Sequence, residues 1–292
     1  KKIVLTKKNI IIGTAQFGKK YSISSNNAVN YIEARRILMK AYKHKIDHLD
    51  TAVNYTKAYN LLKKVNLSNW NIITKFPNLN SIKNSKIQYN IYADKILKDF
   101  KINKIKCVHF HDINQLFSKN GDQLFRILKD LKDKKIIKQI GASVYFPKDV
   151  DRLLKNYNFD VIQCPVNIFD RDFIIKKTLK KLKKRNIEVH VRSIFLQGLL
   201  LMEKEKLPKY FEKWTNEFVK WNQYLSENNV TALEACISFI RQQKDIDKVI
   251  IGVDSVIQLN NILNTFKSKR TINNFNLKIN NKYLLKPSLW QN

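Results

Sequence analysis

Short runs of apolar residues alternate along this chain with longer segments in which apolar residues recur every three or four positions. The short runs have the length of β-strands, and the longer segments have the spacing of amphipathic helices. Leu38, Ala41 and Tyr42, for example, share one side of a helix expected over residues 32–44. The strand-like runs lie at 9–15, 46–50, 71–75, 106–111, 139–143, 161–163, 188–193 and 248–252.

The chain therefore contains about eight β-then-α units in the length expected of a (β/α)8 TIM barrel. Strands that alternate with helices pair in parallel, through right-handed crossovers. A doubly wound sheet is the alternative, but Gly13 and Gly18 do not form its Gly-x-Gly-x-x-Gly dinucleotide turn. We predict an α/β fold, a (β/α)8 barrel in one domain, residues 1–292. The helical patterns lie at 32–44, 55–64, 87–100, 123–134, 148–156, 172–185, 231–243 and 256–266.

Two segments depart from the alternation. Residues 200–229, after the seventh strand-like run, hold Trp214, Phe218 and Trp221 at near-helical spacing. This spacing predicts an extra amphipathic helix packed on the barrel rather than a platform on which bases stack. Residues 268–292 form a tail with isolated apolar residues, which we expect to cover part of one barrel end.

The chain is strongly basic, with 55 Lys and Arg against 24 Asp and Glu and a formal net charge of +31. Such a charge suits a nucleic-acid or anionic-membrane partner when it gathers on one face. Here lysines recur in nearly every expected helix, as at Lys176, Lys177, Lys180 and Lys181. We therefore favour solvated outer helix faces over a nucleic-acid partner. An anionic substrate remains compatible with the charge.

The cysteines and the apolar runs indicate the compartment. No run reaches about 18 consecutive apolar residues, so we expect no membrane span. Cys107, Cys164 and Cys236 are scattered within apolar runs, which predicts buried thiols rather than a disulfide framework or a zinc site. We expect a cytoplasmic protein that holds no metal.

Four side chains able to move or steer a proton stand at or just after strand ends. Asp50, Lys75 and His111 end three successive strand-like runs, and Tyr55 follows after a short turn. In a parallel barrel these ends meet on the face that carries the active site. A phenol has a pKa of about 10, which a nearby ammonium lowers while a carboxylate keeps that ammonium charged. We expect Tyr55 to act as general acid in carbonyl reduction, with His111 orienting the carbonyl.

Each of these residues has a structural alternative when it is considered singly. Asp50 could cap the following helix, and Lys75 could be an ordinary lysine at a strand end. His109 lies two residues before the chosen histidine and points to the same side of the strand. Tyr59, one helical turn after the chosen tyrosine, is a rival phenol. The four residues together, at successive strand ends, favour the catalytic interpretation.

Motifs in chain order give the sequence a resemblance to the aldo-keto reductases. Residues 50–55, DTAVNY, resemble the family's DTAxxY, and Thr74-Lys75 resembles its TK. His111 matches the histidine that closes the fourth strand, which favours it over His109. The likeness spans nearly the whole chain, from about residue 13 to beyond residue 252. Further similar segments are GAS at 141–143 (GVS in the family), QCPVNIFDR at 163–171 (QxxYNxxxR) and RSIFLQGLL at 192–200 (SPLxxGxL).

The resemblance implies an oxidoreductase that transfers a hydride between NAD(P)H and an aldehyde or ketone, without a Rossmann domain. It makes Asp50, Tyr55, Lys75 and His111 the catalytic residues. NADP(H) is the favoured cofactor and NAD(H) the alternative. Gly252 supports the cofactor site physically, since it opens a loop into a helix N-terminus, where backbone N–H groups favour phosphate. The cofactor-binding residues that the resemblance implies are Gly13, Thr14, Ser143, Gln163, Arg192, Ser193, Leu196, Gly198, Gly252, Asp254, Ser255, Gln258 and Asn261.

The chain also departs from the family's pattern. Thr56 replaces a glycine, Arg192 replaces an aromatic residue beside the nicotinamide, and Asp254 adds a negative charge near the 2′-phosphate position. These changes motivate an alternative function, a catalytically weak NAD(P)H-binding barrel that acts as a binding or regulatory module. The opening at 13–18 together with the loop at 192–200 resembles bacterial members of sugar metabolism, which suggests a small sugar-derived carbonyl substrate.

Overall fold

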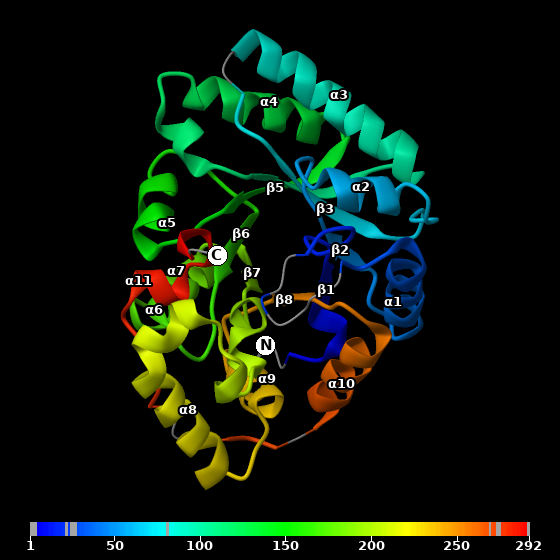
Figure 1. Ribbon diagram of the computed structural model, residues 1–292. Coiled ribbons are helices and arrows are strands. Elements are labelled where there is room, and N and C mark those ends of the chain that lie inside the picture. The colour runs from blue at the N-terminus through cyan, green and yellow to red at the C-terminus, as the bar shows by residue number, and fades with distance from the viewer. Residues whose placement is uncertain are drawn as a thin grey trace.

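The apolar runs form eight parallel strands, β1 to β8, that close into a barrel (Figure 1). Gly13 of β1 pairs with Asp50 of β2 on one side and with Gly252 of β8 on the other, so the sheet closes on itself. This computed structural model describes residues 5–20, 23, 28–79, 82–268, 270–272 and 276–290. The strands are β1 (Ile10–Gly13), β2 (His48–Asp50), β3 (Asn71–Phe76), β4 (Ile105–Phe110), β5 (Ile137–Ser143), β6 (Val161–Pro165), β7 (Glu188–Arg192) and β8 (Lys248–Gly252).

Helices connect the strands and surround the barrel, which confirms the predicted fold and shows the doubly wound alternative to be wrong (Figure 1). The helix predicted over 172–185 is divided in two, because Lys177 takes a left-handed backbone conformation with φ 56°. The α-helices are α1 (Tyr31–Lys43), α2 (Thr56–Leu62), α3 (Ile82–Phe100), α4 (Gly121–Asp133), α5 (Pro147–Leu153), α6 (Asp172–Ile175), α7 (Thr178–Lys184), α8 (Thr215–Glu227), α9 (Ala232–Arg241), α10 (Val256–Lys267) and α11 (Lys282–Leu285). The 3-10 helices are η1 (Lys7–Asn9), η2 (Ile113–Phe117), η3 (Leu196–Leu201), η4 (Lys204–Lys206), η5 (Lys209–Trp214) and η6 (Pro287–Leu289).

Two apolar layers build the core, one inside the barrel and one between the strands and the helices. The inner layer is small and consists of Ile11, Ile73, Cys107, Val161 and Ile250. The outer layer is much larger. The two layers are separate because successive strand residues point alternately into the barrel and toward the helices. Polar side chains occupy inward positions nearer the carboxyl ends of the strands. The apolar filling of the barrel therefore stops below the face where the strands end.

The insertion after β7 forms α8 and packs its aromatic residues on the barrel, as predicted. Trp214, Phe218, Trp221 and Tyr224 are all buried. The indole Nε1 of Trp221 donates a hydrogen bond to the carbonyl of Leu200 at 3.1 Å. These rings fill space between α8 and the barrel and do not offer a stacking surface to bases.

The described part of the tail lies against the carboxyl end of the barrel. Lys286 Nζ donates a hydrogen bond of 3.1 Å to the carbonyl of Tyr145, in the loop after β5. The ring of Trp290 meets that of Phe211 in η5 edge to face, with centroids 4.9 Å apart. The tail thus covers part of one barrel end, as expected from the sequence.

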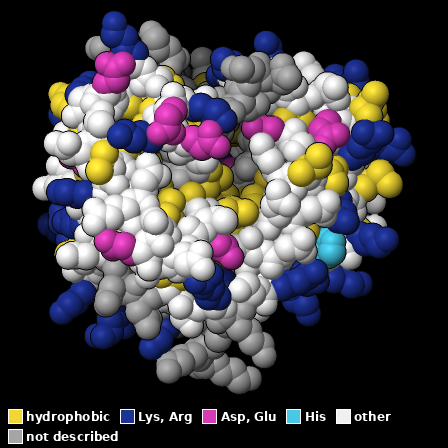
Figure 2. All heavy atoms as spheres, turned by 60° about the horizontal axis from the view of Figure 1, so that its bottom comes forward, with side chains coloured by type: hydrophobic (Ala, Val, Ile, Leu, Met, Phe, Trp, Pro, Cys, Tyr) yellow, Lys and Arg dark blue, Asp and Glu magenta, His cyan; other side chains and the backbone are white. Residues whose placement is uncertain are grey.

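The distributions of charged residues and of cysteines agree with the sequence-based predictions. On the face shown in Figure 2, Lys and Arg lie mainly around the margin, while hydrophobic side chains line a central hollow. Cys107, Cys164 and Cys236 are buried free thiols. Within the described ranges, no helix has the length and apolarity needed to cross a membrane. The described His, Cys, Asp and Glu side chains form no group of three or more suited to a metal ion.

Replacing Trp221 by Ala should remove the aromatic anchor of the insertion. Trp221 is 1% exposed, and its ring centroid lies 5.7 Å from that of Phe169. We expect the free energy of unfolding to fall by about 3–5 kcal/mol, the usual cost of deleting a buried Trp, in urea denaturation followed by circular dichroism. Val219 is 41% exposed on the same helix, so Val219→Ala should change stability by less than about 0.5 kcal/mol. Equal stabilities of the two variants would contradict the anchoring role.

Candidate active site

A cavity of about 460 Å³ opens at the carboxyl ends of the strands, on the face where TIM barrels carry active sites. Its size is that of a small-molecule site. Leu196 and Ser255 were predicted for the site but do not line the cavity, since Leu196 is fully buried and Ser255 caps α10. The predicted residues that do line it are Gly13, Thr14, Asp50, Tyr55, Lys75, His111, Ser143, Gln163, Arg192, Ser193, Gly198, Gly252, Asp254, Gln258 and Asn261.

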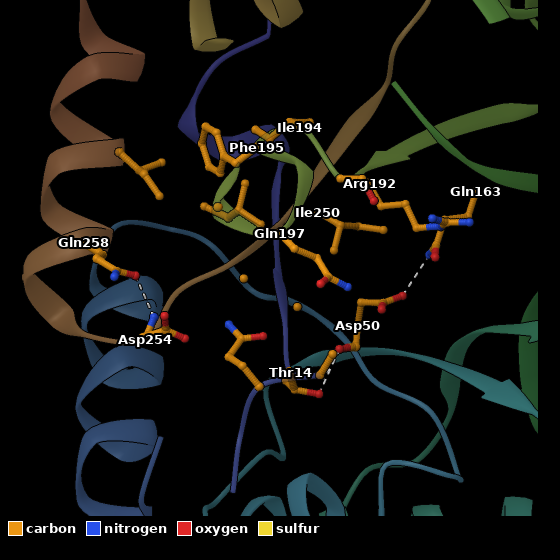
Figure 3. Close-up of a pocket in the computed structure, with 18 of the residues that line it drawn as sticks. Thr14, Asp50, Gln163, Arg192, Ile194, Phe195, Gln197, Ile250, Asp254 and Gln258 are labelled. Atoms are coloured by element: carbon orange, nitrogen blue, oxygen red, sulfur yellow. Dashed lines mark hydrogen bonds between the residues drawn. The ribbon is translucent and has the colours of Figure 1, made fainter. Parts of the chain in front are cut away.

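A buried ion pair forms the floor of the cavity. Lys75 Nζ donates to Asp50 Oδ1 at 2.5 Å and to the Thr51 carbonyl at 3.2 Å. The second carboxylate oxygen, Oδ2, accepts a hydrogen bond of 2.9 Å from Gln163 Nε2 of β6 (Figure 3). Asp50 and Lys75 are 6% and 3% exposed. Asp50 therefore does not cap α2, and Lys75 is not an ordinary solvated strand-end lysine.

Tyr55 and His111 complete the group above this pair. Lys75 Nζ lies 5.8 Å from the centroid of the Tyr55 ring. The His111 ring stands edge to face with the Tyr55 ring, with centroids 6.1 Å apart. Burial and the Lys75 ammonium lower the pKa of His111 to about 4. Its imidazole is therefore neutral near neutral pH and can donate one hydrogen bond from a ring N–H.

The electrostatics of Tyr55 differ from the sequence-based expectation. Burial raises the pKa of its phenol above the ordinary value, and the Asp50 carboxylate raises it further. The Arg192 guanidinium acts in the opposite direction but does not offset the other two effects. The expected lowering by an ammonium is not met, because burial and the Asp50 carboxylate together outweigh the positive charge near the phenol. Tyr55 is thus a protonated phenol in the cofactor-free protein.

The two rival residues lie elsewhere. His109 is fully buried inside the barrel, beside Gly141, at the point where an added Cβ would lie 2.4 Å from His109 Nδ1. It points inward as strand alternation requires, but it lies one inward position deeper than His111 and does not line the cavity. Tyr59 turns away, since its hydroxyl donates to Asp99 Oδ2 at 2.7 Å.

Comparison of the sequence with known protein families identifies the family of this chain. A sequence profile of the aldo/keto reductase family matches residues 9–277. The chain belongs to the aldo-keto reductase family. It is accordingly an NAD(P)H-dependent oxidoreductase, and its substrates are small carbonyl compounds.

Solved structures share the fold of this aldo-keto reductase at low sequence identity. An aldo-keto reductase from Bacillus halodurans, in its holo form, has 18% identity and a TM-score of 0.71, covering 91% of this chain and 88% of that chain. A glycerol dehydrogenase from Gluconobacter oxydans has 18% identity and a TM-score of 0.68, with the same coverage of 91% and 88%. No curated protein matches the chain in sequence.

The loop after β7 gives this reductase an unusual backbone at the cavity wall. Ser193, Leu196 and Gln197 have positive φ values of 61°, 48° and 53°, although none is a glycine. Such conformations cost energy and cluster at ligand-binding segments. Asn167 Nδ2 donates to the Ser193 carbonyl at 3.1 Å and so fixes the start of the loop. Leu196 is fully buried beneath this loop, whose residues Ser193, Gln197 and Gly198 line the cavity.

The opposite end of the cavity is the start of α10. Gly252 approaches Gln16 so closely that an added Cβ would lie 2.7 Å from Gln16 Nε2. Gln258 Oε1 accepts a hydrogen bond of 2.8 Å from the Asp254 N–H, within the same loop (Figure 3). Ser255 contributes by capping the helix through the Gln258 N–H. Asp254 and Gln258 thus mark one end of the cavity, and Asp50 and Gln163 mark the other (Figure 3).

Some lining residues were missed from the sequence. Gln16 follows the end of β1 and Tyr145 follows the end of β5, so their places after strand ends were an available signal. Tyr145 lies 4.4 Å under the Arg192 guanidinium, measured from its ring centroid to Cζ. The other missed residues are Ala15, Ile194, Phe195, Gln197, Leu201, Leu233, Ile250, Ile251 and Ile262.

The raised pKa of Tyr55 predicts a protonated phenol over a wide pH range. In cofactor-free protein we expect no tyrosinate from Tyr55 below about pH 10, the pKa of a free phenol, because burial and Asp50 both oppose ionisation. The measurement is a titration of near-ultraviolet tyrosinate absorbance in wild type and Tyr55→Phe. Their difference should stay flat up to that pH. A phenolate that ionises earlier in wild type and is missing in the variant would contradict this electrostatic picture.

Proposed function

We propose that this aldo-keto reductase reduces an aldehyde or ketone with Tyr55 as the general acid. The observation that carries the proposal is the convergence of a protonated phenol, a neutral imidazole and a buried ammonium–carboxylate pair on one cavity. Tyr55, His111, Lys75 and Asp50 come from three segments of the chain, at or just after the ends of β2, β3 and β4, and all four line the cavity. Packing alone gives no reason for these four groups to meet at one face.

The proposed reaction balances with one carbonyl compound, one NAD(P)H and one proton, which give an alcohol and NAD(P)⁺. The cofactor, when bound, supplies two electrons as a hydride to the carbonyl carbon. Tyr55 transfers its hydroxyl proton to the carbonyl oxygen as negative charge develops there. His111 donates a hydrogen bond to the same oxygen and fixes its orientation. Lys75 lies next to the phenolate that remains, and its ammonium stabilises that charge until Tyr55 regains a proton.

The residues of the cavity suit a nicotinamide dinucleotide. We propose that Ser143 and Gln163 hold the carboxamide and that Arg192, a planar cation, lies on the nicotinamide. The lining of the cavity, which includes Ser143, Gln163 and Arg192, and the positive φ angles of the loop after β7 support this placement. Gly13 and Thr14 would line the nicotinamide end, and Ser193 and Gly198 would follow the pyrophosphate, with Leu196 buried beneath their loop. Gly252, Asp254, Gln258 and Asn261 would surround the adenosine, and Ser255 would hold the start of α10 as its cap. The choice between NADP(H), favoured from the sequence, and NAD(H) would be made at this end.

A small, hydroxylated carbonyl compound, as in a sugar-derived aldehyde or ketone, is the substrate we propose. Tyr145 and Gln197 add polar groups to the cavity wall beyond the four catalytic ones. The structural neighbour from Gluconobacter oxydans is a glycerol dehydrogenase, an enzyme of a small polyol. Both observations favour a substrate with several hydroxyl groups over a purely apolar carbonyl.

Replacing Tyr55 by Phe tests the proposed acid directly. The variant lacks only the hydroxyl, so we expect carbonyl reduction to slow by a factor of roughly 10² to 10⁴, the usual contribution of general acid catalysis. The dissociation constant for NAD(P)H should change little, because the phenol does not hold the dinucleotide. Rates come from the loss of reduced cofactor over a panel of hydroxylated aldehydes and ketones, and dissociation constants from cofactor fluorescence.

Tyr59→Phe is the matched control, since Tyr59 is a nearby phenol whose hydroxyl is bonded to Asp99 and does not line the cavity. It should keep the wild-type rate. Equal rates for wild type and Tyr55→Phe would remove Tyr55 from the mechanism. Wild-type protein that binds NAD(P)H but oxidises it with no carbonyl of the panel would favour the alternative, a barrel that acts as a binding or regulatory module.

A further inference from the structure

The described residues that line one end of the cavity include no Lys or Arg, although the chain as a whole is basic. The chain has 55 Lys and Arg, yet the cations among the described residues that line the cavity are only Lys75 and Arg192. Both lie at the catalytic end. The other end, at the start of α10, is lined by Asp254, Gln258 and Asn261. A dinucleotide with an extra phosphate at this end would meet the Asp254 carboxylate, and none of the described lining residues there is a Lys or Arg.

Two N–H groups of the α10 N-terminus, those of Val256 and Gln258, are also taken by oxygens of the chain itself. The Val256 N–H donates to Glu33 Oε1 at 2.7 Å, and the Gln258 N–H donates to Ser255 Oγ at 3.2 Å. The Asp254 N–H, just before the helix, donates to the Gln258 side chain. A helix N-terminus attracts anions through such free N–H groups. In this protein a carboxylate already holds the first of them.

Glu33 reaches this position from the first turn of α1, which lies beside α10 (Figure 1). Asn30 caps α1 and holds its first turn, because the Asn30 side chain accepts a hydrogen bond of 2.9 Å from the Glu33 N–H. Glu33 forms an ion pair with Arg36, whose guanidinium lies 3.8 Å from Oε2 and whose side chain is 69% exposed. An exposed pair of this kind is screened by water and neutralises the carboxylate weakly.

We infer that Glu33, together with Asp254, makes this reductase select NAD(H) over NADP(H). The inference rests on the proposed function, because it assigns the start of α10 to the adenosine end of the cofactor. A 2′-phosphate brought to this helix start meets two carboxylates, and like charges at close range oppose binding. A free 2′-hydroxyl can instead donate a hydrogen bond to a carboxylate. In other dinucleotide folds, too, an acidic residue at the ribose goes with NAD and an arginine with NADP.

The test uses ligands that lack nicotinamide, so that binding is read without the reaction. ADP-ribose and 2′-phospho-ADP-ribose are titrated into the chain of residues 1–292 by isothermal calorimetry at physiological ionic strength, which screens the general basic charge. Wild type should bind ADP-ribose at least roughly tenfold more tightly than its 2′-phosphate, a modest effect for like charges at close range. NADH and NADPH, followed by fluorescence, should show the same order.

The variants separate charge from structure. Glu33→Gln keeps an oxygen that accepts the Val256 N–H and removes only the charge, and Asp254→Asn does the same at its position. The double variant should lose most of the preference for ADP-ribose, by tighter binding of the 2′-phosphate. Asp130→Asn is the control, since Asp130 is an exposed residue of α4 and its change alters net charge equally. It should leave the preference unchanged.

The outcomes distinguish this inference from the proposed function. Equal binding of the two fragments by wild type, or tighter binding of the 2′-phosphate, overturns the NAD(H) preference and leaves the reductase intact. An unchanged preference in the double variant overturns the role of the two carboxylates. If wild type binds neither fragment and neither dinucleotide, the proposed function is overturned, and the inference is overturned with it.

Discussion

The site depends on one ion pair that is buried where three strand ends meet. Asp50 of β2, Lys75 of β3 and Gln163 of β6 are joined by hydrogen bonds of 2.5 and 2.9 Å. Burying two charges is costly unless their remaining donors and acceptors are satisfied. Here Gln163 donates a hydrogen bond to Asp50, and the Thr51 carbonyl accepts one from Lys75. The pair and its partners thus fix the relative positions of strands that are far apart in sequence. Tyr55 and His111 then take their places above a rigid floor.

Burial and this pair together set the electrostatics of the site. Burial raises the pKa of Tyr55 and the Asp50 carboxylate raises it further, so the phenol stays protonated. Arg192 acts in the opposite direction on Tyr55, and it also lowers the pKa of His111, where burial and Lys75 have larger effects. Arg192 replaces an aromatic residue of the family pattern, and it is held between the Tyr145 ring and the Val144 carbonyl. The replacement of the family's aromatic residue by Arg192 was one reason to consider a catalytically weak barrel. In the structure it places a positive charge near Tyr55, the proposed proton donor.

The barrel and the catalytic end could be predicted from the sequence because both follow from local pattern. Asp50 and Lys75 stand at the ends of apolar runs, and the rule that parallel strand ends converge needs no further information. The break at Lys177 could not be predicted, since a lysine carries no signal for left-handed backbone. The contact of Glu33 with Val256 spans 223 residues and joins two helices that look ordinary in sequence. Such side-chain contacts depend on how helices pack around the barrel, which periodicity does not determine.

The two ends of the cavity thus carry opposite charge within a protein of net charge +31. The excess lysines lie on outer helix faces, where they are solvated and screened over roughly 8 Å at physiological ionic strength. The charged groups among the described residues that line the cavity are Asp50, Lys75 and Arg192 at the catalytic end and Asp254 at the start of α10, where Glu33 accepts the Val256 N–H. Net charge therefore predicts little about which dinucleotide this reductase holds. In the inferred cofactor site, the groups that would discriminate between the two dinucleotides are the carboxylates at the start of α10.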